Sequence, residues 1–174
     1  PVEYFHNILK KQAIVNKGLL LKFKNEVTKG QFEEMDFVYE NGIVDYVNEI
    51  ADGTAMTETK YIECERRGRD REDKPDYNVK LSVAFCFSNK VNMLEYYHNS
   101  SHLEHGGSPD KAVSNAFVYT IDKYLKANNK YTKNESKINF NDVKDCLILV
   151  SNSLSGLTSY ENQTKKAINN KFIQ

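Results

Sequence analysis

The sequence predicts an α+β fold, a mixed sheet of four to five strands covered on one side by helices. Apolar residues alternate with polar or small ones over residues 77–88, which is typical of a strand with one face toward a helix layer. A second apolar run, residues 146–154, indicates a short helix end that passes into a buried strand. Between them, residues 108–128 carry an apolar stripe at helical spacing, so we expect the main helix there.

The N-terminal part predicts a helix, a hairpin and a second helix. Residues 5–16 place apolar side chains at helical spacing, and Gly18 suits the C-terminal cap. Alternation then favours two strands, residues 19–24 and 32–39, around a glycine turn. Residues 43–50 are amphipathic and predict a short helix.

Length and composition restrict the class of protein. The chain has 174 residues, which suits a single domain, 1–174. Its formal net charge is zero, which argues against a dedicated DNA-binding module. We expect no membrane span, because no apolar run is long enough, and three widely spaced cysteines suggest reduced thiols in a cytoplasmic protein. Because the chain begins at Pro1 without Met, we expect an excised fragment of a longer subunit.

Residues 66–76 form a dense run of charges of both signs between two predicted strands. A solvated, mobile hairpin loop is the simplest interpretation, since the charges nearly cancel. The alternative is a loop that contacts DNA, because four arginines lie in it: Arg66, Arg67, Arg69 and Arg71.

The start of the long helix is well marked. Ser108 suits the N-cap, Pro109 the first helical position and Asp110 the positive end of the helix dipole. The preceding pair, Gly106 and Gly107, raises an alternative, a phosphate cradle built from free N–H groups. No Walker pattern accompanies the pair, so we favour a plain helix start. In the next polar stretch, Asn141 suits the cap of a further short helix.

Three histidines, His98, His102 and His105, lie within eight residues of the sequence. Three imidazoles can ligate zinc. No acidic or cysteine partner has ligand spacing, however, and we predict no metal site.

The C-terminal loop, residues 160–170, contains Gln163, Thr164 and Lys165 directly after the buried strand. A lysine held on such a loop is a point-charge binder of phosphate, although a lysine in a polar loop is most often simply solvated. The residues alone leave both interpretations open.

Several motifs in this order resemble the transducer domain of type IIA DNA topoisomerase B subunits, those of bacterial DNA gyrase and topoisomerase IV. They are Asn16-Lys17-Gly18, Tyr39-Glu40-Asn41-Gly42-Ile43, the Gly-Gly pair before the long helix, and Gln163-Thr164-Lys165. The resemblance covers roughly residues 5–170. It implies the ribosomal-protein-like transducer fold of the GHKL ATPases, including a left-handed βαβ crossover. The chain departs from the family where Pro109 replaces a histidine and where residues 152–157 lack its usual basic and proline residues.

The resemblance also implies a function. The domain would couple ATP binding and hydrolysis in a preceding GHKL ATPase domain to DNA strand passage and a change of DNA topology. Lys165 and Gln163 would contact the terminal phosphate of ATP, which is bound with Mg²⁺ by that preceding domain. We expect no catalytic residue, no cofactor and no ATPase activity in the fragment alone. Its implied partners are the ATPase domain, the A subunit, a second B subunit and double-stranded DNA.

Two alternatives remain open. One is the transducer-like domain of a mismatch-repair ATPase, and the other is a non-enzymatic nucleic-acid-binding module of similar fold. The sequence does not separate gyrase from topoisomerase IV.

Overall fold

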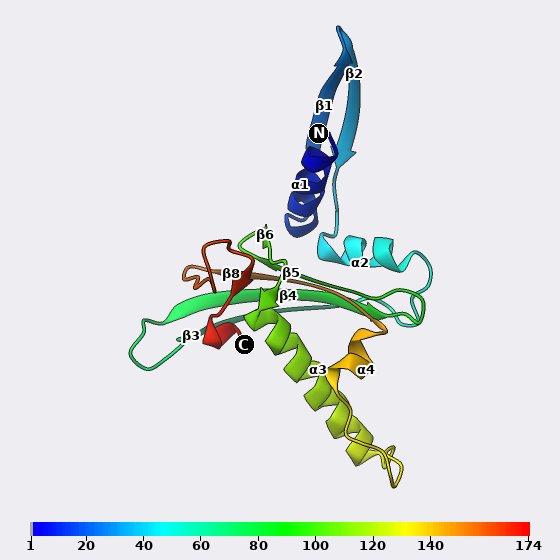
Figure 1. Ribbon diagram of the computed structural model, residues 1–174, viewed down its shortest axis with the longest axis vertical. Helices are drawn as coiled ribbons and strands as arrows, with labels where there is room; N and C mark the ends of the chain where they lie inside the picture. Colours follow the sequence, from blue (N-terminus) through cyan, green and yellow to red (C-terminus); the bar gives the residue numbers. More distant parts are fainter. Residues whose placement is uncertain (1) are drawn as a thin grey trace.

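The computed structural model describes residues 2–174, and a five-stranded sheet lies at its centre (Figure 1). The strand order is β3 (Lys60–Gly68), β4 (Tyr77–Phe87), β8 (Leu147–Ser155), β5 (Met93–His98) and β6 (Ser101–His102). Strands β5 and β8 are parallel, and the other neighbouring pairs are antiparallel. The predicted α+β class and mixed sheet of four to five strands are therefore confirmed.

A crossover connection joins the two parallel strands. The chain leaves β5, passes through α3 (Ser108–Ala127) and α4 (Phe140–Lys144), and returns as β8 beside β5. Parallel neighbours require such a crossover, because a tight turn can join only antiparallel strands. The left-handed sense implied by the resemblance stays a prediction.

Helices cover both faces of the sheet, not one. On β8, Leu147 and Leu149 pack toward α3 and α4, while Ile148 and Val150 pack toward α2 (Ile43–Ala51). The prediction of a single covered face was wrong because the even positions of β4 looked too small and polar to sit in a core. Their small side chains, such as Ala84, instead allow α2 to approach closely.

Helix α3 packs on the sheet through its N-terminal half. Val113 is buried, and Phe117 meets Phe85 edge to face with ring centroids 5.2 Å apart. The C-terminal half runs away from the sheet in Figure 1, and Tyr119 and Tyr124 are exposed there. The prediction of a main packed helix therefore applies to its first turns.

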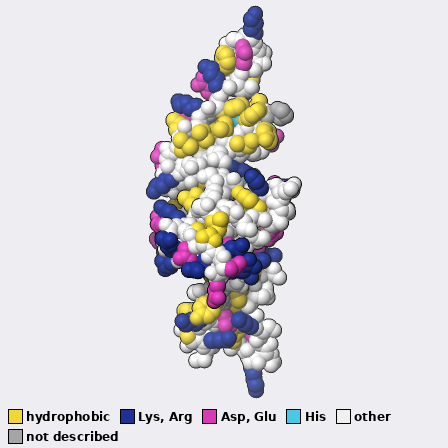
Figure 2. All heavy atoms as spheres, turned by 90° about the vertical axis from the view of Figure 1, so that its left-hand side faces the viewer, with side chains coloured by type: hydrophobic (Ala, Val, Ile, Leu, Met, Phe, Trp, Pro, Cys, Tyr) yellow, Lys and Arg dark blue, Asp and Glu magenta, His cyan; other side chains and the backbone are white. Residues whose placement is uncertain are grey.

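The first part of the described chain stands apart from the sheet (Figure 1). It consists of α1 (Val2–Val15) and a hairpin of β1 (Leu21–Thr28) and β2 (Gln31–Phe37), as predicted. Figure 2 shows hydrophobic side chains gathered on this part of the surface. The exposed apolar residues of these elements are Tyr4, Phe5, Ile8, Val27, Phe32 and Met35.

The structure places two helix N-caps at residues other than those predicted. Gly107, not Ser108, is the N-cap of α3, because a φ of 85° takes Gly107 out of the helix and Ser108 already forms its first turn. In α4 the N-cap is Asn139, not Asn141. The Asn139 side chain accepts a hydrogen bond from Asn141 N–H while Asp142 bonds back to Asn139 N–H, which is a capping box.

The charged hairpin loop is shorter than predicted. Strand β3 continues to Gly68, so Arg66 and Arg67 belong to the strand and the loop spans residues 69–76. Arg69 pairs with Asp76 at 2.6 Å within it. Charges of both signs mix at the middle height of Figure 2. The mobility of the loop stays a prediction.

Among residues 2–174, no helix combines the length and apolar character needed to cross a bilayer.

Candidate functional site

The predicted C-terminal loop leaves the sheet after β8 and folds back on itself. An antiparallel bridge joins Tyr160 to Ile168, and Asn169 N–H donates to Ser159 O at 2.8 Å. This pairing divides the loop into two parts. We call residues 161–165 the loop tip, and the segments on either side of it, 159–160 and 166–170, the loop base.

The loop tip is a tight turn organised by Asn162. Its side-chain oxygen accepts hydrogen bonds from the backbone N–H and the hydroxyl of Thr164, and its carbonyl accepts from Lys165 N–H at 3.3 Å. Lys165 has a φ of 57°, in the left-handed region that residues with a Cβ seldom occupy. Strain of this kind gathers at functional sites, which makes the tip a reasonable candidate.

The structure brings both predicted binding residues, Gln163 and Lys165, to the exposed tip. Lys165 Nζ lies 5.6 Å from the centre of the Tyr160 ring, and within residues 2–174 no carboxylate forms an ion pair with it. The next residue differs, because Lys166 Nζ is 2.6 Å from a carboxylate oxygen of Glu104. Of these two adjacent lysines, Lys165 presents the ammonium without an internal counter-ion.

The Gly-Gly pair holds the loop base. Strand β7 (Gly106–Gly107) pairs in parallel with β9 (Ala167–Ile168), and both β9 residues are buried. At Gly107, any Cβ would overlap the backbone of Ile168, and the φ of 85° disfavours other residues as well. Gly107 is explained by this close approach, and at Gly106, with a φ of 63°, a Cβ would crowd the Asp110 side chain, so neither glycine requires the phosphate cradle considered from the sequence.

A buried histidine fixes the strand that leads into the loop. His98 is fully buried, with Nδ1 2.7 Å from Ser153 Oγ and Nε2 2.8 Å from Thr158 Oγ1. Burial lowers the pKa of His98 to about 4, so the ring is neutral at physiological pH. His102 lies beside Lys11. Among residues 2–174 no group of three or more His, Cys, Asp or Glu side chains is arranged to hold a metal ion.

Sequence reasoning missed two residues that support the loop. One is His98, which was weighed as a metal ligand and instead bonds Thr158. The other is Asn170, which is fully buried and accepts a hydrogen bond from Ser159 N–H across the loop base. Nothing in the local sequence distinguishes Asn170 from its exposed neighbour Asn169.

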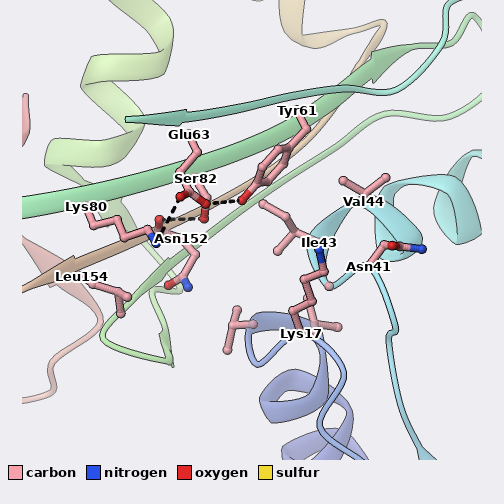
Figure 3. A pocket seen from close by; sticks show the side chains of 13 residues that line it. Lys17, Asn41, Ile43, Val44, Tyr61, Glu63, Lys80, Ser82, Asn152 and Leu154 are labelled. Atoms are coloured by element: carbon pink, nitrogen blue, oxygen red, sulfur yellow. Dashed lines mark hydrogen bonds and ion pairs between the residues drawn. The ribbon is translucent and has the colours of Figure 1, made fainter. Parts of the chain in front are cut away.

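A separate cleft of about 430 Å³ lies where the ends of α1 and α2 approach the sheet (Figure 3). On the sheet side, Glu63 accepts hydrogen bonds from Tyr61 OH at 2.7 Å and Lys80 Nζ at 3.1 Å. Asn152 also lines the cleft, and its buried side-chain oxygen lacks a protein partner within the described residues. The cleft is lined by the end of α1, the start of α2 and strands of the sheet, and it does not include the loop tip.

Chemically, the loop tip offers the ammonium of Lys165 and the carboxamide of Gln163 on a turn whose two ends are held, beside the carboxylate of Glu161 and the carboxamide of Asn162, which organises the turn. The first two groups can bind an anion through charge and hydrogen bonds, as the sequence analysis predicts for Lys165 and Gln163. The tip is thus suited to contact with a phosphate group supplied from outside these residues.

Comparison with known proteins identifies relatives of this chain. A family model described as DNA gyrase B matches residues 42–174. The DNA gyrase B protein of Metamycoplasma arthritidis is 28% identical over 163 residues, which cover 93% of this chain and 25% of the relative. That of Mycoplasma genitalium is 26% identical over 169 residues, 95% of this chain and 26% of the relative. The chain spans about a quarter of the length of the curated relatives it matches.

Solved structures show the same fold. The 43K ATPase domain of Thermus thermophilus gyrase B, in complex with an aminocoumarin, matches with a TM-score of 0.70 and 18% identity over 99% of this chain and 44% of its own. The topoisomerase IV ATP binding domain of Francisella tularensis, in complex with a small-molecule inhibitor, matches with a TM-score of 0.70 and 22% identity. That match covers 99% of this chain and 43% of the other.

Proposed function

We propose that this chain, which belongs to the DNA gyrase B family, is the transducer domain of an ATP-dependent type II DNA topoisomerase. In this proposal it couples ATP binding and hydrolysis in a preceding GHKL ATPase domain to passage of one DNA duplex through another. The observation that carries it is Lys165, an exposed ammonium on a strained turn above a buried base. That arrangement is suited to sensing a ligand held by another domain.

The role of Lys165 follows from its charge and accessibility. ATP, held with Mg²⁺ by the preceding domain, supplies an anionic terminal phosphate. Because Lys165 has no carboxylate partner within residues 2–174, its ammonium is available to that phosphate without breaking an existing ion pair. Gln163 stands two residues away on the same tip and adds an amide donor.

The attraction of Lys165 depends on the state of the nucleotide. An ammonium interacts more strongly with a charged terminal phosphate than with the site after that phosphate has left. The difference biases the angle between this chain and the preceding domain, because a ligand shifts an equilibrium by its differential affinity for the two states. The sheet to which the loop base is attached would transmit that change.

The N-terminal elements support a preceding domain. Helix α1 and the β1–β2 hairpin expose Tyr4, Phe5 and Phe32, although aromatic side chains gain most from burial. A domain packed against them would remove this apolar surface from water. The A subunit, a second B subunit and double-stranded DNA are the further partners of this proposal, and we expect the chain alone not to hydrolyse ATP.

The decisive experiment replaces Lys165 in the full-length subunit. With the A subunit present, we expect Lys165→Ala to lower ATP hydrolysis about 100-fold or more, as removal of one donor to a developing charge does in other enzymes. Binding of a non-hydrolysable ATP analogue and the melting temperature should stay close to wild type, and DNA supercoiling or relaxation should fall with hydrolysis. Wild-type hydrolysis and strand passage in this variant would refute the proposal.

A further inference from the structure

We infer that Asp70 and Asn170 form a clamp that positions the loop tip and therefore Lys165. Asp70 lies in the β3–β4 loop and Asn170 ends the loop base, so the clamp joins segments that are 100 residues apart in the sequence. The inference rests on the proposed function, because it gives both residues a positioning role toward the phosphate contact made by Lys165.

Asn170 holds both ends of the loop base. Its Oδ1 accepts from Ser159 N–H at 2.7 Å. Its Nδ2 has three acceptors within reach, which are Asp70 Oδ2 at 3.1 Å, the Tyr77 hydroxyl oxygen at 3.2 Å and Leu157 O at 3.3 Å. A backbone N–H can only donate, and a carbonyl or ionised carboxylate can only accept, so the partners fix the orientation of the amide. Asn170 is also fully buried, which leaves water no access to replace these bonds.

Asp70 anchors the other side of the clamp. Its Oδ1 accepts from Tyr77 OH at 2.6 Å and from Phe172 N–H at 2.8 Å. Burial and the Asp70 carboxylate raise the pKa of Tyr77 to about 12, so its hydroxyl keeps the proton that it donates. Asp70 therefore binds the side chain of Asn170 and the backbone of Phe172, two points on the same C-terminal segment.

Apolar packing holds the C-terminal segment in the same place. The Phe172 ring lies against Gly68 so closely that a Cβ at Gly68 would overlap it. The ring also meets Tyr77 edge to face, with centroids 5.7 Å apart. Figure 1 shows this segment beside the end of β3. The β3–β4 hairpin is thus joined to the C-terminal segment that ends the loop base by both hydrogen bonds and packing.

The clamp matters because Lys165 stands only five residues before Asn170. When the clamp opens, Asn170 loses Asp70, and Ser159 and Leu157 lose the fixed amide of Asn170 that joins them. Both ends of the loop base are then free to shift, and the ammonium loses its fixed position. Misplacement of a catalytic contact by about 1 Å costs roughly 100-fold in rate, so the effect should appear in turnover.

The test uses Asn170→Asp, Asp70→Asn and the double exchange in the full-length subunit with the A subunit. Asn170→Asp puts two carboxylates face to face, and Asp70→Asn puts two amide donors face to face while its oxygen keeps Tyr77 OH and Phe172 N–H. The exchange restores a donor opposite an acceptor between positions 70 and 170, although Leu157 O then faces a carboxylate. We expect each single variant to lower kcat for ATP hydrolysis at least about 10-fold with KM within about twofold, and the exchange to recover part of the loss.

Two neighbouring residues provide matched controls. Asn169→Asp alters an exposed side chain on the same segment, and Asp73→Asn alters an exposed carboxylate in the same hairpin loop. Both should keep wild-type kcat. Melting temperatures and the stoichiometry of a bound non-hydrolysable ATP analogue are measured for every variant, so that a loss of folded protein is not mistaken for a loss of turnover.

The outcomes separate this inference from the proposed function. If Lys165→Ala abolishes hydrolysis while both clamp variants turn over at the wild-type rate, the clamp does not position Lys165 and the inference is overturned alone. If Lys165→Ala hydrolyses ATP normally, the proposed function and this inference fall together. An exchange that turns over no faster than the slower single variant would also overturn the inference, because restoring a donor opposite an acceptor at positions 70 and 170 would then have no effect.

Discussion

At the loop base, Ala167, Ile168 and Asn170 are at most 2% exposed, whereas all five residues of the loop tip are exposed. The base is paired with β7 through backbone hydrogen bonds and packs into the core cluster that includes Tyr96 and Leu147. The tip is held by bonds within its own turn. The two regions are adjacent in sequence, yet one is built for rigidity and the other for access.

The difference suggests a division of labour. A cation that senses a ligand of another domain must be accessible, and it must also stay in one place. An exposed side chain on a base that is anchored by the buried residues Ala167, Ile168 and Asn170 meets both needs. Substitutions of buried residues in or beneath the base should therefore change the free energy of unfolding, while substitutions at the tip should change activity with little loss of stability.

The largest effect on stability is expected for Gly107→Ala. The added Cβ would overlap the backbone of Ile168 at a φ of 85°, so overpacking adds to backbone strain. Together these should lower the free energy of unfolding by about 3 kcal/mol or more. Gly53→Ala is the matched control, because its φ is 76° with open space around it, and it should cost about 1 kcal/mol. If urea unfolding shows that the two variants lose the same free energy of unfolding, the β7–β9 contact does not hold the base.

A smaller effect is expected from the pH dependence of His98. The folded chain keeps His98 neutral with a pKa lowered to about 4, whereas the unfolded chain has the ordinary value near 6.5. The unfolded state thus binds an extra proton between these values. The stabilisation is complete above about pH 6.5 and is lost as the pH falls toward 4, by about 2 kcal/mol between pH 6.5 and 4.5.

The comparison with His98→Gln isolates this contribution. Glutamine keeps hydrogen-bonding capacity toward Ser153 and Thr158 but does not titrate. The difference in unfolding free energy between wild type and variant should therefore shrink as the pH falls. A difference that stays constant from pH 7 to 4.5 would contradict a buried, neutral His98.

A substitution at the loop tip should instead raise the free energy of unfolding. Lys165 occupies the left-handed region at a φ of 57°, which glycine adopts without steric cost. We expect Lys165→Gly to raise the free energy of unfolding by about 0.5 to 1 kcal/mol while it abolishes the phosphate contact. Gln163→Gly is the control, because Gln163 has no positive φ to relieve and should lose stability or stay unchanged. A destabilised Lys165→Gly would remove the evidence for strain at the tip.

The sequence predicted the tip better than the base. Gln163-Thr164-Lys165 was recognised as a motif, and local residue types are enough to predict a polar turn. The base depends on contacts between distant segments, such as Gly107 with Ile168 and Asp70 with Asn170, and periodicity carries no information on them. Asn170 lies in a polar stretch, where burial of its amide could not be foreseen.

The distinction between local signals and contacts of distant segments also explains which features of the sheet could be predicted. The strands were predicted because alternation and apolar runs are local signals. The second helix layer was missed because Ala84 and Cys86 look like a solvent-facing row until α2 is seen packed on them. The shifted caps have a similar cause, since Ser108 is a good cap by residue type, whereas pairing of the Gly-Gly pair with β9 moves the N-cap to Gly107.

The smallest effect is expected at Lys166, and it sharpens the comparison most closely because Lys165 is its neighbour. Lys166 and Glu104 form an ion pair in which both side chains are about half exposed. Exposed pairs contribute little because water and salt screen them, so Lys166→Ala should hardly change the free energy of unfolding or ATP hydrolysis by the full-length subunit. Lys165→Ala removes the same number of charges one residue away and should lower hydrolysis about 100-fold or more. If the two variants lose hydrolysis equally, the loop supplies general positive charge, and the distinction between a paired and an available lysine has no functional meaning.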